Sequence, residues 1–429
     1  MQGSFIISAL TWELTFFIAM NVFWISLYFL FRKRSAVKGP IDYFVSIIIP
    51  VFNKGGFLRK SINSALNLAY KNKEIILVND GSTDDSESIC RDYERGGFVK
   101  FINFKQNHGK AHALNTGIKM AKGDLILTMD ADSFINKNAL NRMIEHFADK
   151  KVGAVAGVVR ANKAGGILNR LQILEYFQQG FQRIIQGFFH AVLVLPGPIS
   201  LYSREALAKS GGFEKDTLVE DWDMTLKVHK AGYGVISEKN AFADTIVPKK
   251  IGDWWRQRTR WSRGGIKIAK KHTNILHKSN TKALTRLIFP LHIMWLIVPF
   301  IVIPTMIWIL IPSNMAIANV MAHMSLLLAS IKDWVFAGAG LSIVDMYRVI
   351  DLIIVDFMDF STFGWVRFLG YASGLAFLWF TYTSIRAFEP QFKPKHLVTV
   401  LLMPIYWLML NAVYVYSLII ELSKGELKW

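Results

Sequence analysis

The sequence predicts an α/β domain with a mostly parallel sheet, set between helices that span a membrane or lie on its surface. Between residues 41 and 275, short β-branched runs alternate with helical patterns, as in a sheet covered by helices. Apolar stretches long enough to cross a bilayer lie on both sides of that region. We therefore expect an anchor with a basic linker (1–40), the α/β domain (41–275) and C-terminal membrane helices (276–429).

The N-terminal segment is predicted to be an uncleaved membrane anchor. Residues 5–31 are apolar apart from Glu13, and Arg32, Lys33 and Arg34 follow them. That length spans a bilayer, and the basic flank belongs on the cytoplasmic side. A cleavable signal peptide is the alternative, but no basic stretch precedes the apolar run and no small-residue cleavage site follows it.

Three buried strands are predicted in the α/β domain, at 45–50, 74–78 and 124–129, with helical spacing at 58–68 between the first two. Short β-branched apolar runs are typical of parallel strands that are covered on both faces. Acidic motifs follow the second and third strands. Ligands of parallel α/β sheets bind at these carboxyl ends, so both motifs stand where a site is expected.

Two amphipathic helices are predicted at 167–190 and 251–269, and both carry aromatic residues on the apolar face. Such helices can lie in the plane of a membrane interface. They can equally pack their apolar faces on the sheet. The sequence leaves both interpretations open.

The C-terminal region is predicted to cross the membrane four times. The candidate spans are 287–311, 315–331 (the weakest), 365–385 and 397–420. The acidic stretch 333–360 suits the outer face and the basic loop 386–396 the inner face. A helical pair within 315–360 would give six spans with the same sidedness.

The net charge of +18 invites a nucleic-acid interpretation. The basic residues are scattered, however, and many flank apolar segments, where they would face anionic lipid headgroups. We therefore expect membrane lipids and no nucleic acid as partners. The single cysteine, Cys90, cannot form an internal disulfide or a thiolate metal cluster, which suits a reducing cytoplasm.

Asp130 and Asp132 place two carboxylates directly after a strand. Their oxygens suit Mg²⁺ or Mn²⁺, which would bridge to the diphosphate of a sugar nucleotide and assist its departure. A solvated turn is the ordinary alternative for such a pair.

Asp80 ends the second strand within Asn-Asp-Gly-Ser and could accept hydrogen bonds from a nucleotide base, although this tetrapeptide also suits an ordinary turn. Lys110 follows a glycine and could face phosphate, or simply begin a helix.

Glu220 and Asp221 precede a helical pattern. The helix macrodipole favours an ionised acid there, and such a carboxylate can remove the proton from an acceptor hydroxyl. An acidic pair that only caps the helix is the alternative.

The most specific motif follows some thirty-six residues later and consists of Gln257, Arg258, Arg260 and Trp261. The arginines suit a departing diphosphate and the indole a sugar ring; an interfacial helix with snorkelling arginines is the alternative.

These motifs, in this order, resemble those of the membrane-integrated, processive family-2 glycosyltransferases. That group includes cellulose, chitin, hyaluronan and poly-N-acetylglucosamine synthases. The resemblance covers residues 42–270 and extends to the membrane layout. Asn-x-Gly-Lys-x-x-Ala-Leu-Asn at 107–115 and Arg-Trp-Ser-Arg-Gly-Gly at 260–265 are most similar to the poly-N-acetylglucosamine synthases.

The resemblance implies a GT-A fold, a UDP-sugar donor, a divalent metal and a hexosyltransferase that inverts the anomeric carbon. By position, Asp80 would contact uridine, and Asp130 and Asp132 would bind the metal diphosphate. Asp221 would be the base, with Glu220 beside it. The implied place of Gln257, Arg260 and Trp261 is where acceptor sugar meets pyrophosphate, and an accessory export subunit is a possible partner.

The sequence departs from that pattern in two places. Val219 stands before the acid pair, where Thr is common. The sequence also lacks a C-terminal cyclic-dinucleotide-binding domain, so regulation of the cellulose-synthase kind is not expected within this chain.

The leading hypothesis is a processive synthase, with the catalytic domain cytoplasmic, that passes its polymer through a multi-pass plasma-membrane region. A non-processive transferase that adds one sugar to a lipid is the alternative. A basic membrane protein that binds or forms a pore without catalysis is a third hypothesis, and the intact motifs disfavour it. The sequence does not identify the sugar, although the resemblance favours N-acetylglucosamine.

Overall fold

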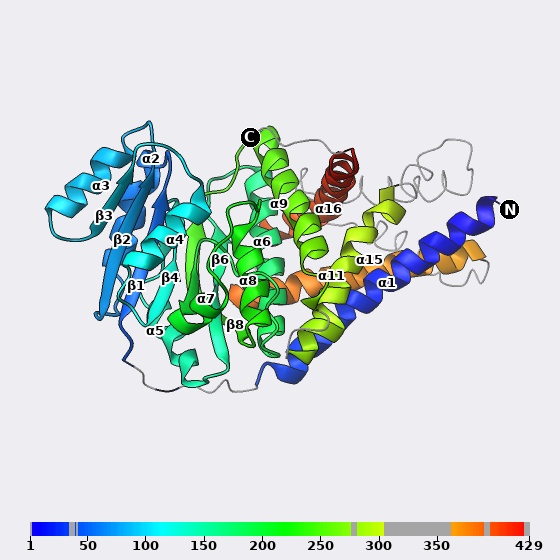
Figure 1. Cartoon of the computed structure of the whole chain (residues 1–429). Coiled ribbons are helices and arrows are strands. Elements are labelled where there is room, and N and C mark those ends of the chain that lie inside the picture. The colour runs from blue at the N-terminus through cyan, green and yellow to red at the C-terminus, as the bar shows by residue number, and fades with distance from the viewer. Residues whose placement is uncertain are drawn as a thin grey trace. The chain divides into compact units, whose positions relative to one another are not determined.

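The structure is a computed structural model of the chain and describes residues 2–33, 39, 42–275, 281–303, 362–389 and 395–423. The chain divides into two compact units: Met1–Ile25 with Ile297–Phe380, and Ser26–Leu296 with Thr381–Trp429. The second unit holds the whole sheet and every residue of the candidate site (Figure 1).

The second unit is built from short strands and from helices that cover them. The strands are β1 (Val45–Val51), β2 (Lys73–Asp80), β3 (Lys100–Phe104), β4 (Leu125–Thr128), β5 (Ser133–Ile135), β6 (Val152–Ala161), β7 (Ser200–Ser203) and β8 (Gly234–Thr245). The helices among them are α2 (Gly55–Leu66), α3 (Ser86–Arg95), α4 (Lys110–Met120), α5 (Ala139–Ile144), the 3₁₀ helix η1 (Glu145–Ala148), α6 (Ile167–Gly187), α7 (Arg204–Lys209), α8 (Glu220–Lys230) and α9 (Ile251–Lys271).

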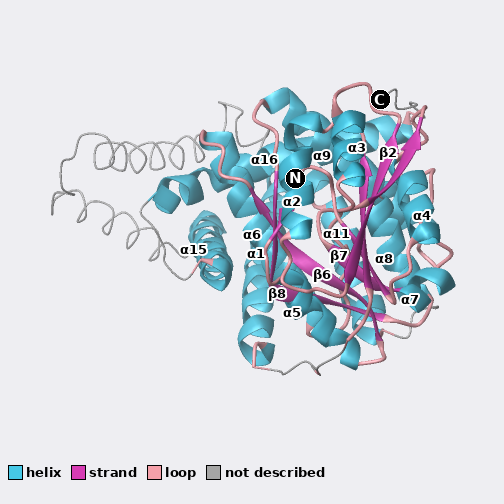
Figure 2. Cartoon of the chain, turned by 90° about the vertical axis from the view of Figure 1, so that its left-hand side faces the viewer, coloured by secondary structure: helices cyan, strands magenta, loops and turns pink. Residues whose placement is uncertain are grey.

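The eight described strands form one mixed sheet in the order β3-β2-β1-β4-β7-β6-β8-β5. β1 pairs in parallel with β2 and β4, β2 with β3, and β6 with β8. β7 is antiparallel to β4 and β6, and β5 to β8. Helices cover both faces (Figure 2). The α/β class and the mostly parallel sheet are therefore confirmed, and the antiparallel β7 lies between two parallel groups.

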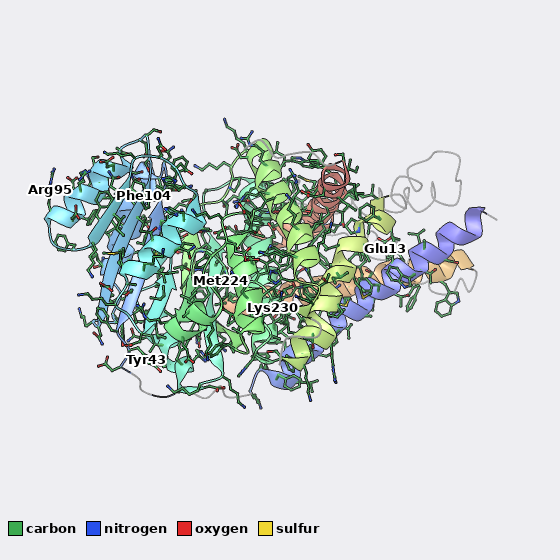
Figure 3. The ribbon with its side chains drawn as sticks, viewed as in Figure 1. Glu13, Tyr43, Arg95, Phe104, Met224 and Lys230 are labelled. Carbon is green, nitrogen blue, oxygen red and sulfur yellow. The ribbon has the colours of Figure 1, made fainter. Side chains whose placement is uncertain are left out.

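Strand β1 lies inside the sheet because its side chains are apolar on both faces. Ile47 and Ile49 belong to a core cluster with α2, α3 and α5, whereas Ile48 belongs to a second cluster with α4, α7 and α8. This division follows from the strict alternation of strand side chains. The second cluster extends from Phe104 on the edge strand β3 to Met224 on α8 (Figure 3). Burial on both faces fixes the register of β1, and the register sets where the acidic motifs lie.

The two amphipathic helices pack against different parts of the structure. α6 packs on β6 and β8, with Leu174, Phe177 and Phe181 buried. α9 packs on α16 (Lys395–Leu422), and both helices lie in the second unit. Packing on the sheet therefore accounts for part of the apolar face of α6, whose Phe177 and Phe181 contact Phe388 and Tyr28, while α9 lies against a long apolar helix.

Three helices of the described ranges are long and apolar enough to cross a membrane: Ser8–Phe31, Leu284–Ile303 and Thr399–Leu422. The first lies in α1 (Gln2–Phe31), the second includes the π-helical η2 (Leu284–Ile288) and α11 (Phe289–Ile297), and the third lies in α16. They match the predicted anchor and two predicted C-terminal spans. The predicted span 365–385 is helical, within α15 (Thr362–Phe388), but is not among these three. The spans predicted within 315–360 lie outside the described residues.

Candidate active site

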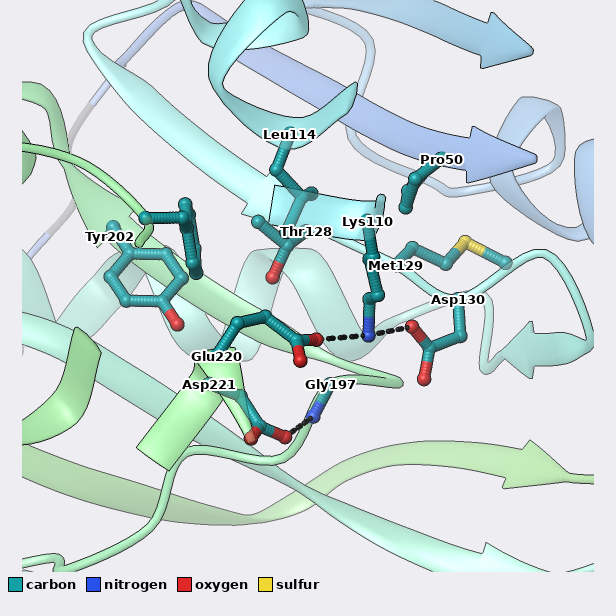
Figure 4. Close-up of a pocket in the computed structure, with 11 residues that line it drawn as sticks. Pro50, Lys110, Leu114, Thr128, Met129, Asp130, Gly197, Tyr202, Glu220 and Asp221 are labelled. Atoms are coloured by element: carbon teal, nitrogen blue, oxygen red, sulfur yellow. Dashed lines mark hydrogen bonds and ion pairs between the residues drawn. The ribbon is translucent and has the colours of Figure 1, made fainter. Parts of the chain in front are cut away.

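A pocket opens where β1 and β4 end and where α4 and α8 begin (Figure 4). This is the carboxyl edge of the parallel strands, as the sequence predicted. The lining combines apolar walls with a few charged groups: Pro50, Lys110, Leu114, Thr128, Met129, Asp130, Gly197, Tyr202, Phe213, Glu220 and Asp221. Such a lining suits a ligand that is oriented by a small number of polar contacts.

Lys110 lies at the centre of the charged groups. Its Nζ is 2.7 Å from Asp130 Oδ1 and 2.7 Å from Glu220 Oε1. Burial alone would lower the pKa of the Lys110 ammonium, but the carboxylates of Asp130 and Glu220 outweigh that effect and raise it well above its ordinary value. Lys110 is therefore a permanent cation that joins the two acidic motifs.

Burial and the neighbouring ammonium act oppositely on the two carboxylates that flank Lys110. Burial raises the pKa of Asp130, with the charge of Asp132 acting in the same direction and that of Lys110 against it. For Glu220 the ammonium of Lys110 outweighs burial and lowers the pKa. Glu220 is therefore held ionised, whereas Asp130 ionises less readily than an ordinary aspartate.

Asp80 fixes the start of the helix that carries Lys110. The Asp80 carboxylate is buried and accepts the backbone N–H groups of His108 (2.9 Å) and Gly109 (2.8 Å). Gly109 is the residue before α4 and has φ +89°, a conformation that favours glycine. Asp80 thus connects the end of β2 to the Lys110 helix, and its predicted contact with uridine stays a prediction.

Asp221 faces the same pocket from the first turn of α8. Its Oδ2 accepts the backbone N–H of Gly197 (3.0 Å) and its Oδ1 that of Trp222 (2.8 Å). Burial, with the adjacent Glu220 carboxylate, raises the pKa of Asp221 to about 6. A Cβ at Gly197 would lie 3.0 Å from both Asp130 Oδ2 and Lys110 Nζ, so a larger residue here would crowd the ion pair.

Asp132 binds a different lysine. Lys54 Nζ, at the start of α2, lies 2.7 Å from Asp132 Oδ2. Within the described ranges, no three His, Cys, Asp or Glu side chains form a cluster that would hold a metal by protein ligands alone. Two carboxylates nevertheless fit Mg²⁺ or Mn²⁺, since Mg²⁺ is commonly bound by one or two carboxylates with substrate phosphates and water.

The α9 motif lies partly against the loop before α8. Arg260 donates from Nη1 to the carbonyl oxygen of Leu218 (3.1 Å), two residues before the acid pair. Trp261 is partly buried against the first core cluster. Gln257 accepts a hydrogen bond from Arg258 Nη1 through its side-chain oxygen. The Arg260 contact therefore connects α9 to the segment that carries Glu220 and Asp221.

The family model described as Glycosyl transferase family 2 matches residues 46–211. Residues 46–211 are therefore similar to the family 2 glycosyltransferases. Relatives include the poly-beta-1,6-N-acetyl-D-glucosamine synthases of Staphylococcus epidermidis, 33% identical over 263 residues, and of Staphylococcus aureus, 34% identical over 262 residues. Each match covers 58% of this chain, and the chain spans 64% and 63% of the length of these two relatives.

Among solved structures, the chain is similar to the mannosyltransferase PcManGT from Pyrobaculum calidifontis, in complex with GDP-Man and Mn²⁺. The TM-score is 0.57 at 20% sequence identity, and the match covers 86% of this chain and 99% of that chain. At this identity the likeness shows the fold alone. The predicted GT-A fold is confirmed.

Arg258 occupies a different environment from the one that the sequence suggested. The prediction placed its guanidinium on a departing diphosphate. In the structure the residue is 3% exposed and pairs with Glu175 of α6, which is 2% exposed. Because Arg258 Nε and Nη2 contact Glu175 and Nη1 contacts Gln257, we assign Arg258 no direct contact with a ligand in the Lys110 pocket.

Three residues of the site were not predicted from the sequence. Lys54 pairs with Asp132, and Gly197 donates to Asp221. Arg183 of α6 donates from Nε to the Val194 carbonyl (3.1 Å), in the loop that leads to Gly197. Burial lowers the pKa of Arg183 to about 10, against the attraction of Asp221. Lys54 was detectable as a polar residue just after the first strand, whereas the other two depend on a loop between distant elements.

Proposed function

We propose that this chain is an inverting glycosyltransferase that uses a UDP-sugar, with UDP-N-acetylglucosamine as the best candidate. Its product would be a β-linked polysaccharide that is passed across the membrane through the chain's own helices. The names of the Staphylococcus relatives support the sugar and the polymer. The three apolar helices support a membrane location, and the basic residues after 5–31 support a cytoplasmic catalytic domain.

The observation that carries the proposal is the position of Asp221 in the Lys110 pocket, with its pKa raised to about 6. A carboxylate of that pKa is ionised at neutral pH and is a stronger base than an exposed aspartate. We infer that Asp221 removes the proton of the acceptor hydroxyl while its oxygen attacks the anomeric carbon. The bond between that carbon and the diphosphate oxygen breaks, and UDP leaves with the electron pair.

The charged neighbours of Asp221 suit the leaving group. Lys110 would lie beside the diphosphate, because its ammonium faces the pocket from the first turn of α4. Asp130 and Asp132 would hold a divalent metal, which offsets the negative charge of the diphosphate when bound. Lys54 and Lys110 each lie 2.7 Å from one of these carboxylates. The two lysines therefore balance the negative charge of Asp132 and Asp130.

Replacing Asp132 with Asn is expected to lower transfer by about 10²-fold or more, because one anionic ligand of the diphosphate metal is lost. The amide keeps the shape of the side chain and removes only its charge. Transfer should be measured as UDP release over a titration of Mg²⁺ and Mn²⁺. A shift of the titration to higher metal concentration supports the assignment, and an unchanged titration with unchanged rate contradicts it.

The pKa of Asp221 predicts the acid limb of the pH profile. Transfer should fall as pH drops through about 6, because the base becomes protonated. The same raised pKa means that the folded chain holds this proton more tightly than the unfolded chain. Its contribution to stability is therefore fully present below the ordinary aspartate pKa and is lost as pH rises through about 6. Rates between pH 5 and 8 at saturating donor test the limb, and a flat profile across pH 6 contradicts it.

A donor screen with the purified chain in nanodiscs tests the function itself. UDP release should be greatest with UDP-N-acetylglucosamine and should accompany a product of many sugars on sizing gels. A lipid that carries one sugar as the sole product would favour the non-processive alternative. No UDP release with any UDP-sugar and either metal would contradict the proposal.

A further inference from the structure

We propose that Arg258 is a positioning residue, held by Glu175 and Tyr406, that orients Gln257 and Trp261 toward the acceptor sugar. This inference rests on the proposed function, since it assigns Gln257 and Trp261 to the acceptor. Arg258, Gln257 and Trp261 lie on α9, Glu175 on α6 and Tyr406 on α16. A buried polar network therefore connects the candidate acceptor motif to one of the three membrane-length helices.

The Glu175 carboxylate fixes one side of the Arg258 guanidinium. Arg258 Nε lies 3.1 Å from Glu175 Oε1, and Arg258 Nη2 donates to Glu175 Oε2. Two parallel contacts of this kind fix both the position and the plane of the guanidinium. Gln179, one turn further along α6, donates to Glu175 Oε1 at 3.1 Å and holds the carboxylate in turn.

Helix α16 completes the support. The Tyr406 hydroxyl donates to Glu175 Oε2, and the Trp254 indole N–H donates to the Tyr406 oxygen (2.7 Å). Tyr406 and Trp254 are both fully buried. The second Glu175 oxygen is therefore held by α9 and by α16 together, which makes the plane of the guanidinium depend on α16.

The other side of the guanidinium contacts the acceptor motif. Arg258 Cζ lies 4.3 Å from the centre of the Trp261 ring, and Arg258 Nη1 donates to the Gln257 side-chain oxygen. Gln257 and Trp261 are four residues apart and share a face of the helix. One fixed cation thus sets the direction of the Gln257 amide and the tilt of the Trp261 indole.

Packing alone does not require an ion pair at this place. A buried ion pair can often be replaced by apolar residues of similar volume without loss of stability, whereas removing one partner leaves an unpaired buried charge. Methionine in both positions would fill the space, but it offers neither a donor to Gln257 nor a planar cation over Trp261. The double change to methionine therefore separates a structural role from a positioning role.

The experiment compares wild type with E175M/R258M and with R258K, in nanodiscs with UDP-N-acetylglucosamine. Three quantities are measured for each: the melting temperature, the donor KM from UDP release, and the ratio of sugar incorporated into product to UDP released. We expect E175M/R258M to melt near wild type and to keep the donor KM. Incorporation per UDP should fall at least about tenfold, because displaced acceptor groups lower the fraction of productive encounters. R258K keeps the charge without the planar fork and should lose incorporation as well.

The matched control is R263M/E421M, which removes a different ion pair of α9, the one with Glu421 of α16. Arg263 pairs with Glu421 and not with Glu175, so incorporation per UDP should stay within about twofold of wild type. Wild-type incorporation in E175M/R258M, or an equal loss in the control, overturns the inference. A wild-type chain that incorporates no sugar overturns the proposed function instead, which keeps the two failures distinct.

Discussion

Asp221→Asn should lower the rate of sugar transfer by about 10²–10⁴-fold, because the chain loses its general base. The amide can still accept the Gly197 N–H that the carboxylate accepts at 3.0 Å, so the pocket should keep its shape. UDP binding should be retained, since the proposal places Asp221 on the acceptor. Single-turnover transfer and equilibrium binding of UDP, measured on the same preparation, check both statements.

The control for this variant is Asp216→Asn, an exposed carboxylate five residues earlier in the chain. It removes the same charge from the same region without touching the pocket, so transfer should match wild type. Undiminished transfer by Asp221→Asn would contradict the assignment of the base. Equal losses in the two variants would show that net charge, and not the base, limits the rate.

Lys110→Met should have the second largest effect, a loss of about 10²–10³-fold, because a cation that is proposed to stabilise the leaving group is removed. The substitution also leaves Asp130 and Glu220 without their shared ammonium. Glu220 should then take up a proton at higher pH than in wild type, since Lys110 is what lowers its pKa. Lys110 also lowers the pKa of the base Asp221, so the remaining activity should move to higher pH.

Initial rates from pH 5 to pH 9 test this prediction, with UDP binding as the check on folding. Lys119→Met on the exposed side of α4 is the matched control and should leave both the rate and the pH profile unchanged. A Lys110→Met variant with the wild-type rate would remove Lys110 from the mechanism. A lowered rate with an unshifted pH profile would contradict its coupling to Glu220 and Asp221.

The first half of the sheet was predictable because its signals are local. β1, β2 and β4 contain apolar β-branched runs that are buried on both faces, and the acidic motifs follow them at fixed spacing. β6 and β8 were not predicted. β6 is rich in Gly and Ala, and β8 carries Glu238, Lys239 and Asn240 near its centre, where the β6–β8 register is irregular. The apolar run of β6 is therefore weaker in β-branched residues than that of β1, and β8 has no continuous apolar pattern of the kind that marks a buried strand.

The class of this protein follows from its sequence: an α/β domain beside apolar helices, with Asp130 at a strand end and Asp221 at a helix start. Strand alternation, helix starts and span length are properties of neighbouring residues, so a single sequence records them. Which charges meet depends on the packing of distant segments. Lys110 joins Asp130 to Glu220, and Arg258 pairs with Glu175, which also accepts the Tyr406 hydroxyl.

Glu175 and Tyr406 are separated by 231 residues, and no local pattern relates them. A buried guanidinium requires a buried carboxylate, and the fold alone places that carboxylate within reach. The sequence therefore located the chemistry along the chain, and the packing of α6, α9 and α16 determined which side chains face the pocket and which hold them there.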